Sequence, residues 1–136
     1  MFLSDAVRNA GLDALETTMS TAVILRIYNG TPPANETTAL SGNTLLAEGT
    51  LPSDWLGAAS GGVKSKAGTW TVTGQTGAGA GTDATFGRIY RSDGTTCDVQ
   101  FTVGETADTP EMVLDNKNIA DAQVVTVSAF ALTAGN

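Results

Sequence analysis

The sequence predicts an all-β domain, an antiparallel β-sandwich or jelly roll of about seven to eight strands after a short N-terminal helix. Three observations predict this class. Short stretches of alternating apolar and polar residues recur along the chain, separated by turn residues. Thr, which favours strands, is abundant, and 16 glycines favour corners. The 136 residues suit a single domain, with a helical arm over 1–20 and the β-sandwich over 21–136.

Segment 4–18 is predicted to be the helix. Ser4 is a good N-cap because its hydroxyl can accept a hydrogen bond from a free backbone N–H of the first turn. Asp5 then lies near the positive end of the helix dipole, where a carboxylate is stabilised. Apolar residues recur at helical spacing on roughly one face, namely Leu3, Val7, Ala10, Ala14 and Leu15.

The first half of the β-region contains three predicted strands. Residues 22–28 form the clearest, with apolar residues at 23, 25 and 27 facing one side. Segment 29–43 is predicted to be a loop because Pro32 and Pro33 cannot donate to a sheet. A strand over 44–50, a loop over 51–63 that carries Trp55, and a strand over 66–73 follow.

The second half begins with a glycine-rich segment, 74–82, which is predicted to be a flexible linker. Two strands, 84–91 and 95–103, are joined by a turn in which Asp93-Gly94 is a strong hairpin signal. After an acidic turn come a short strand over 112–114 and the longest strand, 123–133. Its apolar residues lie on both faces, so we expect it to be central or covered by a partner.

Composition excludes several kinds of chemistry. The chain has no histidine and one cysteine, Cys97, which removes Ser–His–Asp and Cys–His catalysis, His-ligated zinc and an intrachain disulfide. Cys97 alternates with apolar residues and is interpreted as a small buried hydrophobe. We therefore predict a protein that is not an enzyme, and assign no catalytic residue, cofactor or metal ion.

A net charge of -7 argues against partners that carry phosphate. Nucleic acids and anionic membranes need clustered Lys and Arg, whereas the seven cations here are scattered. The chain has no apolar run long enough for a transmembrane helix, and residues 1–5 lack the features of a secretory signal. We expect the protein to stay in the cytoplasm where it is made, or to join an assembly there.

Weaker patterns leave alternatives open. The segment 77–81 has glycines but lacks the Gly-Lys-Ser/Thr ending of a phosphate loop. A cation could bind among turn carboxylates, although the twelve-residue calcium loop is absent. Trp55 and Trp70 are expected in the core more than on a ligand platform. The carboxylates considered for acid–base work or cation binding are Asp83, Asp93, Asp98, Glu105, Asp108 and Glu111.

Three stretches resemble small virion structural proteins of tailed bacteriophages, of the decoration, cement or head-fibre kind. They are residues 3–15, residues 25–33 followed by 45–47, and residues 124–133. The resemblance implies a non-enzymatic β-sandwich or jelly-roll protein that binds the outer surface of an assembled capsid and strengthens it. Its implied partners are the major capsid protein, or other virion proteins, and further copies of itself in a dimer or trimer. Its implied location is the capsid surface of a virion assembled in the host cytoplasm.

Two other functions remain as alternatives: a neck, tail or baseplate component of the same virion, and a carbohydrate-binding β-sandwich module. A hydrolase is the least favoured. The candidate contact elements are the N-terminal helix, the loop 29–43 and any exposed sheet edge.

Overall fold

The computed structural model describes residues 1–135, and Asn136, the last residue of the predicted β-region, lies outside them. These residues form one α-helix, two short 3-10 helices and ten strands. The helices are α1 (Asp5–Met19), η1 (Thr76–Ala78) and η2 (Thr106–Asp108). The strands are β1 (Ile24–Asn29), β2 (Thr44–Thr50), β3 (Val63–Ser65), β4 (Thr71–Gly74), β5 (Thr82–Asp83), β6 (Phe86–Tyr90), β7 (Cys97–Gly104), β8 (Met112–Leu114), β9 (Asn118–Ile119) and β10 (Val124–Thr133).

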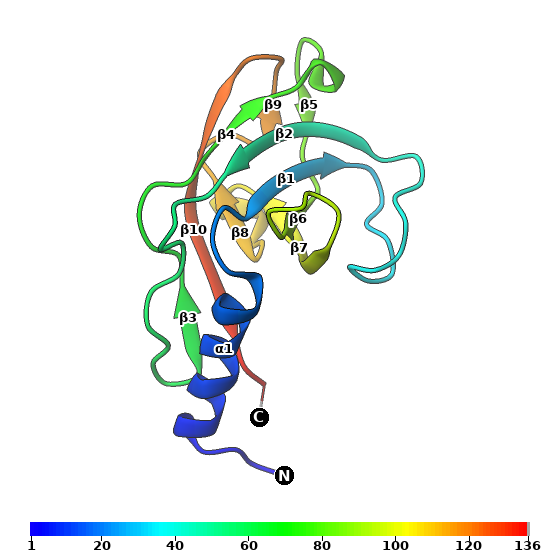
Figure 1. The fold of residues 1–136 in the computed structure, drawn as a ribbon. Coiled ribbons are helices and arrows are strands. Elements are labelled where there is room, and N and C mark those ends of the chain that lie inside the picture. The colour runs from blue at the N-terminus through cyan, green and yellow to red at the C-terminus, as the bar shows by residue number, and fades with distance from the viewer. Residues whose placement is uncertain (136) are drawn as a thin grey trace.

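Seven of the strands close into a barrel (Figure 1). The order β10-β4-β2-β1-β6-β7-β8 returns to β10, because β8 also pairs with β10, and β3 adds to the far end of β10. The β-rich class with a short N-terminal helix is confirmed, whereas the sandwich or jelly roll is not. The difference arises because β10 is ten residues long and pairs with β4 on one edge and β8 on the other. Strands β7 and β8 run parallel, and the other pairs are antiparallel.

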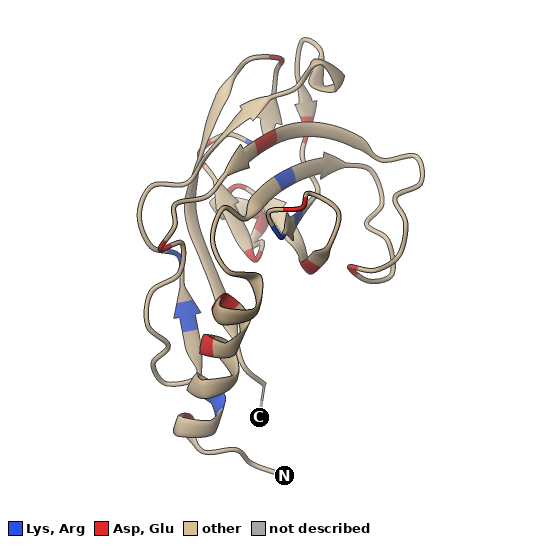
Figure 2. Ribbon diagram, viewed as in Figure 1, with Lys and Arg blue, Asp and Glu red and all other residues tan. Residues whose placement is uncertain are grey.

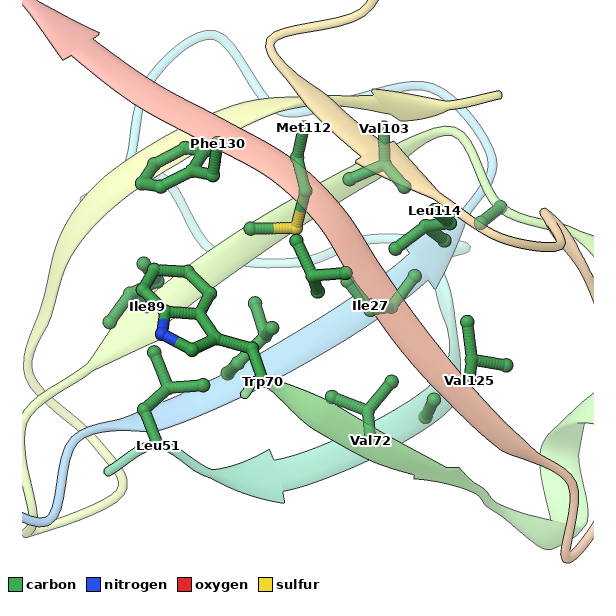
Figure 3. Packing of buried hydrophobic residues seen from close by; sticks show 14 of the residues in the cluster. Ile27, Leu51, Trp70, Val72, Ile89, Val103, Met112, Leu114, Val125 and Phe130 are labelled. Carbon is green, nitrogen blue, oxygen red and sulfur yellow. The ribbon is translucent and has the colours of Figure 1, made fainter. Parts of the chain in front are cut away.

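The barrel interior is filled by side chains (Figure 3). Trp70 contacts Phe130 with ring centroids 5.5 Å apart, and Phe130 lies 5.0 Å from Phe101. The predicted alternation over 22–28 is confirmed, because Val23, Leu25 and Ile27 are fully buried. Dense packing of this kind leaves the interior to the core itself, so any contact with another molecule must use the outer surface.

The predicted strand 66–73 is shorter in the structure, because β4 begins only at Thr71. Strand β3, Val63–Ser65, lies just before the predicted strand and begins at the end of the predicted loop 51–63. Between β3 and β4, Gly68 has a φ of +68°, a conformation that glycine adopts readily and that interrupts an extended chain. The linker prediction over 74–82 also needs correction, because η1 forms there and buries Ala78. Strands β5 and β9 were not predicted, since two residues are too few to show an alternating pattern.

Helix α1 has the predicted extent, but the predicted face is wrong. Ser4 caps it by accepting a hydrogen bond from the Val7 N–H (3.4 Å). The buried residues are Leu12 and Met19, with Leu15 partly buried, whereas Val7 is 55% exposed. Larger side chains bury more apolar area, so they determine which face packs. Counting alanines and leucines equally in the sequence obscured this difference.

Helix α1, strand β3 and residues 131–133 of β10 project together from one end of the barrel (Figure 1). We call this projection the stalk. The helix packs against β3, which in turn pairs with the end of β10. The stalk therefore presents a helix on a short two-stranded support, outside the closed part of the sheet.

Candidate docking surface

Acidic positions on α1 lie beside a basic position on β3 (Figure 2). Ion pairs between these residues hold the helix of the stalk. The Lys64 ammonium, whose side chain is 3% exposed, lies 2.7 Å from Asp13 Oδ1 and 3.1 Å from Glu16 Oε2. A buried ammonium is costly unless it is paired, and here two carboxylates one helical turn apart pair with it. Lys64 therefore helps to hold the side of α1 that carries Leu12 and Met19 against the sheet.

The contacts between Lys64 and the two carboxylates shift the pKa values of Asp13 and Lys64. The hydrogen bond from Lys64 holds the pKa of Asp13 below its usual range. Burial alone would lower the pKa of Lys64, but its hydrogen bonds with Asp13 and Glu16 and their charges outweigh burial and raise the pKa. Asp13 and Lys64 are consequently both charged near neutral pH, and their ion pair holds α1 against β3 at that pH.

The first half of α1 is held by polar contacts with the chain around β3 and β10. Arg8 Nε donates to the Ala134 carbonyl (3.3 Å), and Arg8 also pairs with Asp5 (3.0 Å). Asn9 Oδ1 accepts a hydrogen bond from the Gly62 N–H (2.8 Å). Gly62 has a φ of +78°, which favours glycine, and a Cβ there would overlap the Arg8 guanidinium, so that side chain would have to move. A glycine at this position lets the helix lie close.

The side of α1 that packs on the stalk carries Leu12 and Met19 and is flanked by the charged residues, and the opposite side carries small uncharged residues; Asp13, whose side chain is 52% exposed, lies at the border between the two. All four charged residues of the helix have partners in the stalk. We call the opposite side the outer face; its exposed residues are Ala6, Val7, Ala10, Gly11, Ala14, Thr17 and Thr18. Surface helices usually direct charge to solvent, so an exposed helix side made of small uncharged residues is less polar than such surfaces normally are.

The tip of the stalk, residues 1–3, is also apolar and exposed. Phe2 is 89% exposed, and Leu3 is 39% exposed. Exposed large apolar side chains that follow one another in a short segment are informative, because they offer a contact surface to another molecule, and Val7 in the first turn of α1 is exposed as well. Tip and outer face together form the candidate docking surface.

The loop 29–43, the second expected contact element, is held against the outside of the barrel by hydrogen bonds. The Arg88 guanidinium donates to the carbonyls of Asn35 (3.0 Å) and Thr38 (2.8 Å). Gln100 Nε2 donates to the Pro33 carbonyl (2.8 Å). The Asn35 side chain accepts hydrogen bonds from the Thr37 and Thr38 N–H groups. The loop thus covers the outer side of β6 and buries Arg88.

Two features of the fold limit the third expected contact element, an exposed sheet edge. Barrel closure pairs β10 on both sides. The outer edge of β3 is covered by its own preceding loop, because the Gly57 N–H donates to the Ser65 carbonyl (2.8 Å) and Ser60 exchanges hydrogen bonds with Val63. Strand β3 is therefore a poor template for pairing with another chain.

The turn carboxylates considered for cation binding do not converge. Asp108 pairs with Lys117 (2.9 Å), Glu111 accepts from the Thr102 N–H (2.8 Å), and Glu105 accepts from the Lys117 N–H (3.2 Å). Asp98 pairs instead with Arg91 (2.7 Å). Across residues 1–135 no group of three His, Cys, Asp or Glu residues could hold a metal ion.

The remaining candidate residues, Trp55, Trp70 and Cys97, lie at buried or half-buried positions. Trp55 and Trp70 are both fully buried, which confirms the core interpretation. Cys97 is half-buried, and burial raises the pKa of its thiol, so the thiolate is disfavoured. A shallow hollow of about 430 Å³ beside α1 is lined by Asp13 and Glu16, but both carboxylates are paired with Lys64.

Among the residues that the structure describes, no helix combines the length and apolar character needed to cross a bilayer. Searches with the chain against protein-family models, curated proteins and solved structures found no match.

Proposed function

We propose that the protein is a non-enzymatic structural component of a bacteriophage virion, which binds the outer surface of the capsid and stabilises it. The sequence resemblance to small virion proteins suggests this role. The observation that carries it is the stalk. Ion pairs with Lys64 hold α1 against β3 there, while the tip and the outer face expose apolar side chains such as Phe2 and Val7.

A surface of this kind suits adhesion. Moving a side chain such as Phe2 from water into a protein contact contributes about 1.5–3 kcal/mol. A specific interface usually buries roughly 800 Å² on each partner, so the stalk tip would act together with neighbouring surface. Many copies on one shell would add avidity without any change in the individual contact. Such clamps across subunit junctions would oppose opening of the shell.

Electron microscopy of virions that carry the protein, and of virions stripped of it, tests the proposal. We expect density for the protein on the head, and loss of resistance to heat and osmotic shock after stripping. Adding back purified protein should restore both. Unchanged resistance after stripping would contradict stabilisation, and density confined to the neck, tail or baseplate would establish the alternative role.

The tip can be tested with a matched pair of substitutions. Phe2→Ser removes an 89% exposed aromatic from the stalk, and Val124→Ser removes a 63% exposed apolar side chain from the opposite end of β10. We expect Phe2→Ser to weaken binding to stripped capsids about tenfold or more, since roughly 1.4 kcal/mol corresponds to a factor of ten. Val124→Ser should bind as the wild type does. Equal binding by all three proteins would exclude the tip as the contact.

A further inference from the structure

The outer side of the barrel wall carries two neighbouring arginines but only one carboxylate that pairs with them. The strand register places four polar residues opposite one another across β2, β1, β6 and β7, in the order Glu48, Arg26, Arg88 and Gln100. Glu48 pairs with Arg26, whereas the neighbour of Arg88 on its other side is the neutral Gln100. Like charges directly opposite each other in a sheet repel, so this row has one positive charge in excess.

Arg88 is buried without a counter-charge. The residue is 4% exposed, and all its acceptors are neutral. Its Nε donates to Gln100 Oε1 (2.9 Å), and its Nη2 donates to the carbonyls of Asn35 (3.0 Å) and Thr38 (2.8 Å). Within residues 1–135 no Asp or Glu forms an ion pair with Arg88, and its Nη1 has no acceptor. Buried charges are normally paired, so this guanidinium is suited to an anion from outside the chain.

Arg88 lines a hollow of about 450 Å³ between the loop 29–43 and the turn that joins β6 to β7. This volume lies within the range of small-molecule sites. The Nη1 of Arg88 is not enclosed by protein atoms, so it can be reached from the hollow. Apart from Arg88 and Glu36 the lining is uncharged, and much of it is hydroxylic, with side chains from Thr37, Thr38, Tyr90, Thr95 and Thr96.

We propose that this hollow binds the carboxylate of a small molecule, a free acid or a sugar acid, through the Arg88 guanidinium. The planar, forked guanidinium matches the geometry of a carboxylate, and the hydroxyls around it suit a polar ligand. Glu36 favours a carboxylate over a phosphate, because it repels the second negative charge of a phosphate more strongly than it repels a single charge. The site shares no residue with the stalk, so it does not depend on binding to a capsid.

Nuclear magnetic resonance titrations of the ¹⁵N-labelled chain test the proposal. The probes are sodium acetate, sodium glucuronate and sodium phosphate, at an ionic strength held constant with sodium chloride. We expect acetate and glucuronate to shift the amide signals of residues 36–40 and 95–97, with saturation in the millimolar range. Tighter binding of glucuronate would support a sugar acid as the ligand, and equal binding would support a small free acid. Shifts equal to those in sodium chloride alone, or tighter binding of phosphate than of either carboxylate, would overturn the proposal.

Glu36→Gln tests the charge of the site without removing any of the hydrogen bonds that Arg88 donates to the loop. It should lower the dissociation constant of glucuronate about threefold or more, because a repelling charge is removed. Asp54→Asn is the matched control: it changes the net charge equally, and Asp54 is exposed and does not line the hollow. A Glu36→Gln variant that binds no better than Asp54→Asn would overturn the proposal, whether or not an Arg88 variant folds.

Arg88→Gln tests the guanidinium itself and should abolish the saturable shifts. Its control is Gln100→Ala, which removes the hydrogen bond to the Pro33 carbonyl of the same loop but retains the guanidinium. We expect Gln100→Ala to bind glucuronate. Loss of binding in Gln100→Ala as complete as in Arg88→Gln would mean that binding requires only a fastened loop, and would overturn the role of Arg88.

Discussion

Gly49 in β2 illustrates how a single residue sets the distance between neighbouring strands. A Cβ at this position would overlap the backbone carbonyl oxygen of Thr71 and lie 3.1 Å from the Cα of Val72. Both obstacles belong to β4, whose backbone cannot move without disturbing the sheet. Glycine is therefore required here by space, and the sequence alone gave no sign of it.

Gly49→Ala should destabilise the protein by about 1–3 kcal/mol, since an added methyl group forces a backbone shift. The control is Gly57→Ala, where the nearest atom to the new Cβ is the Ser65 carbonyl oxygen at an ordinary 3.7 Å. Urea denaturation followed by tryptophan fluorescence measures both. A Gly49→Ala variant as stable as Gly57→Ala would show that β4 can retreat at little cost.

Residues predicted from the alternation over 22–28 were placed correctly, whereas Cys97, expected to be buried from the alternation over 95–103, is only half-buried, and residues whose role depends on distant partners were not predicted. Leu25 and Ile27 were predicted from period-two spacing and are fully buried. Lys64 was not expected inside, because its burial requires Asp13 and Glu16, which lie about fifty positions away in the sequence. An ion pair between residues so far apart in the sequence produces no local sequence pattern from which it could be predicted.

At the scale of elements, α1 depends on charge as well as on apolar packing. The helix was predicted from its cap and spacing, and it was also expected to be a contact element. Its orientation was not predictable from the spacing of small apolar residues, because Leu12 and Met19 pack inward and ion pairs with Lys64 hold that side against β3. The loop 29–43 was expected to contact partners, yet Arg88 and Gln100 fasten it to the barrel.

The docking of α1 should weaken at both extremes of pH. The pKa of Asp13 is lowered from 3.8, so its contribution is complete above pH 3.8 and is lost as the pH falls through the lower folded value. The pKa of Lys64 is raised from 10.5, so its contribution is complete below pH 10.5 and is lost as the pH rises through the higher folded value. Between these limits α1 should stay in place.

The indole N–H of Trp55 reports on this change, because it donates to the Ser20 carbonyl at the end of α1 (3.3 Å). Its NMR signal should shift at both limits, while the Trp70 indole, bonded to the Ala67 carbonyl (2.9 Å), should shift less. In Lys64→Met the alkaline shift should disappear. Identical alkaline shifts of both indoles in wild type and variant would show that Lys64 does not control the docking.

For the whole molecule, the decisive feature is the double pairing of β10. Its length and its two apolar faces were visible in the sequence, and its central place is confirmed by pairing with β3, β4 and β8. Closure was not predictable, because strands of a sandwich and of a closed barrel both bury one alternating face. The contact between β8 and β10 depends on the curvature of the entire sheet, which no single segment encodes.

Phe130 joins these parts, and its removal should affect the entire molecule. It pairs with Met112 across β8 and β10, and its ring contacts Trp70 and Phe101. Phe130→Ala should lower the free energy of unfolding by about 3–5 kcal/mol, as expected for a buried aromatic. Val124→Ala, at an exposed position of the same strand, should change it by about 0.5 kcal/mol or less.

Urea titrations monitored by tryptophan fluorescence and by far-ultraviolet circular dichroism test both values and the cooperativity of the barrel. Both tryptophans are buried in the core that β10 closes, so the two signals should change together in the wild type and in Val124→Ala. In Phe130→Ala the common midpoint should fall without separating into two transitions. A fluorescence change that precedes the loss of sheet would mean that β10 detaches from the barrel before the other strands unfold. Closure of the barrel would then be weaker than the double pairing of β10 implies.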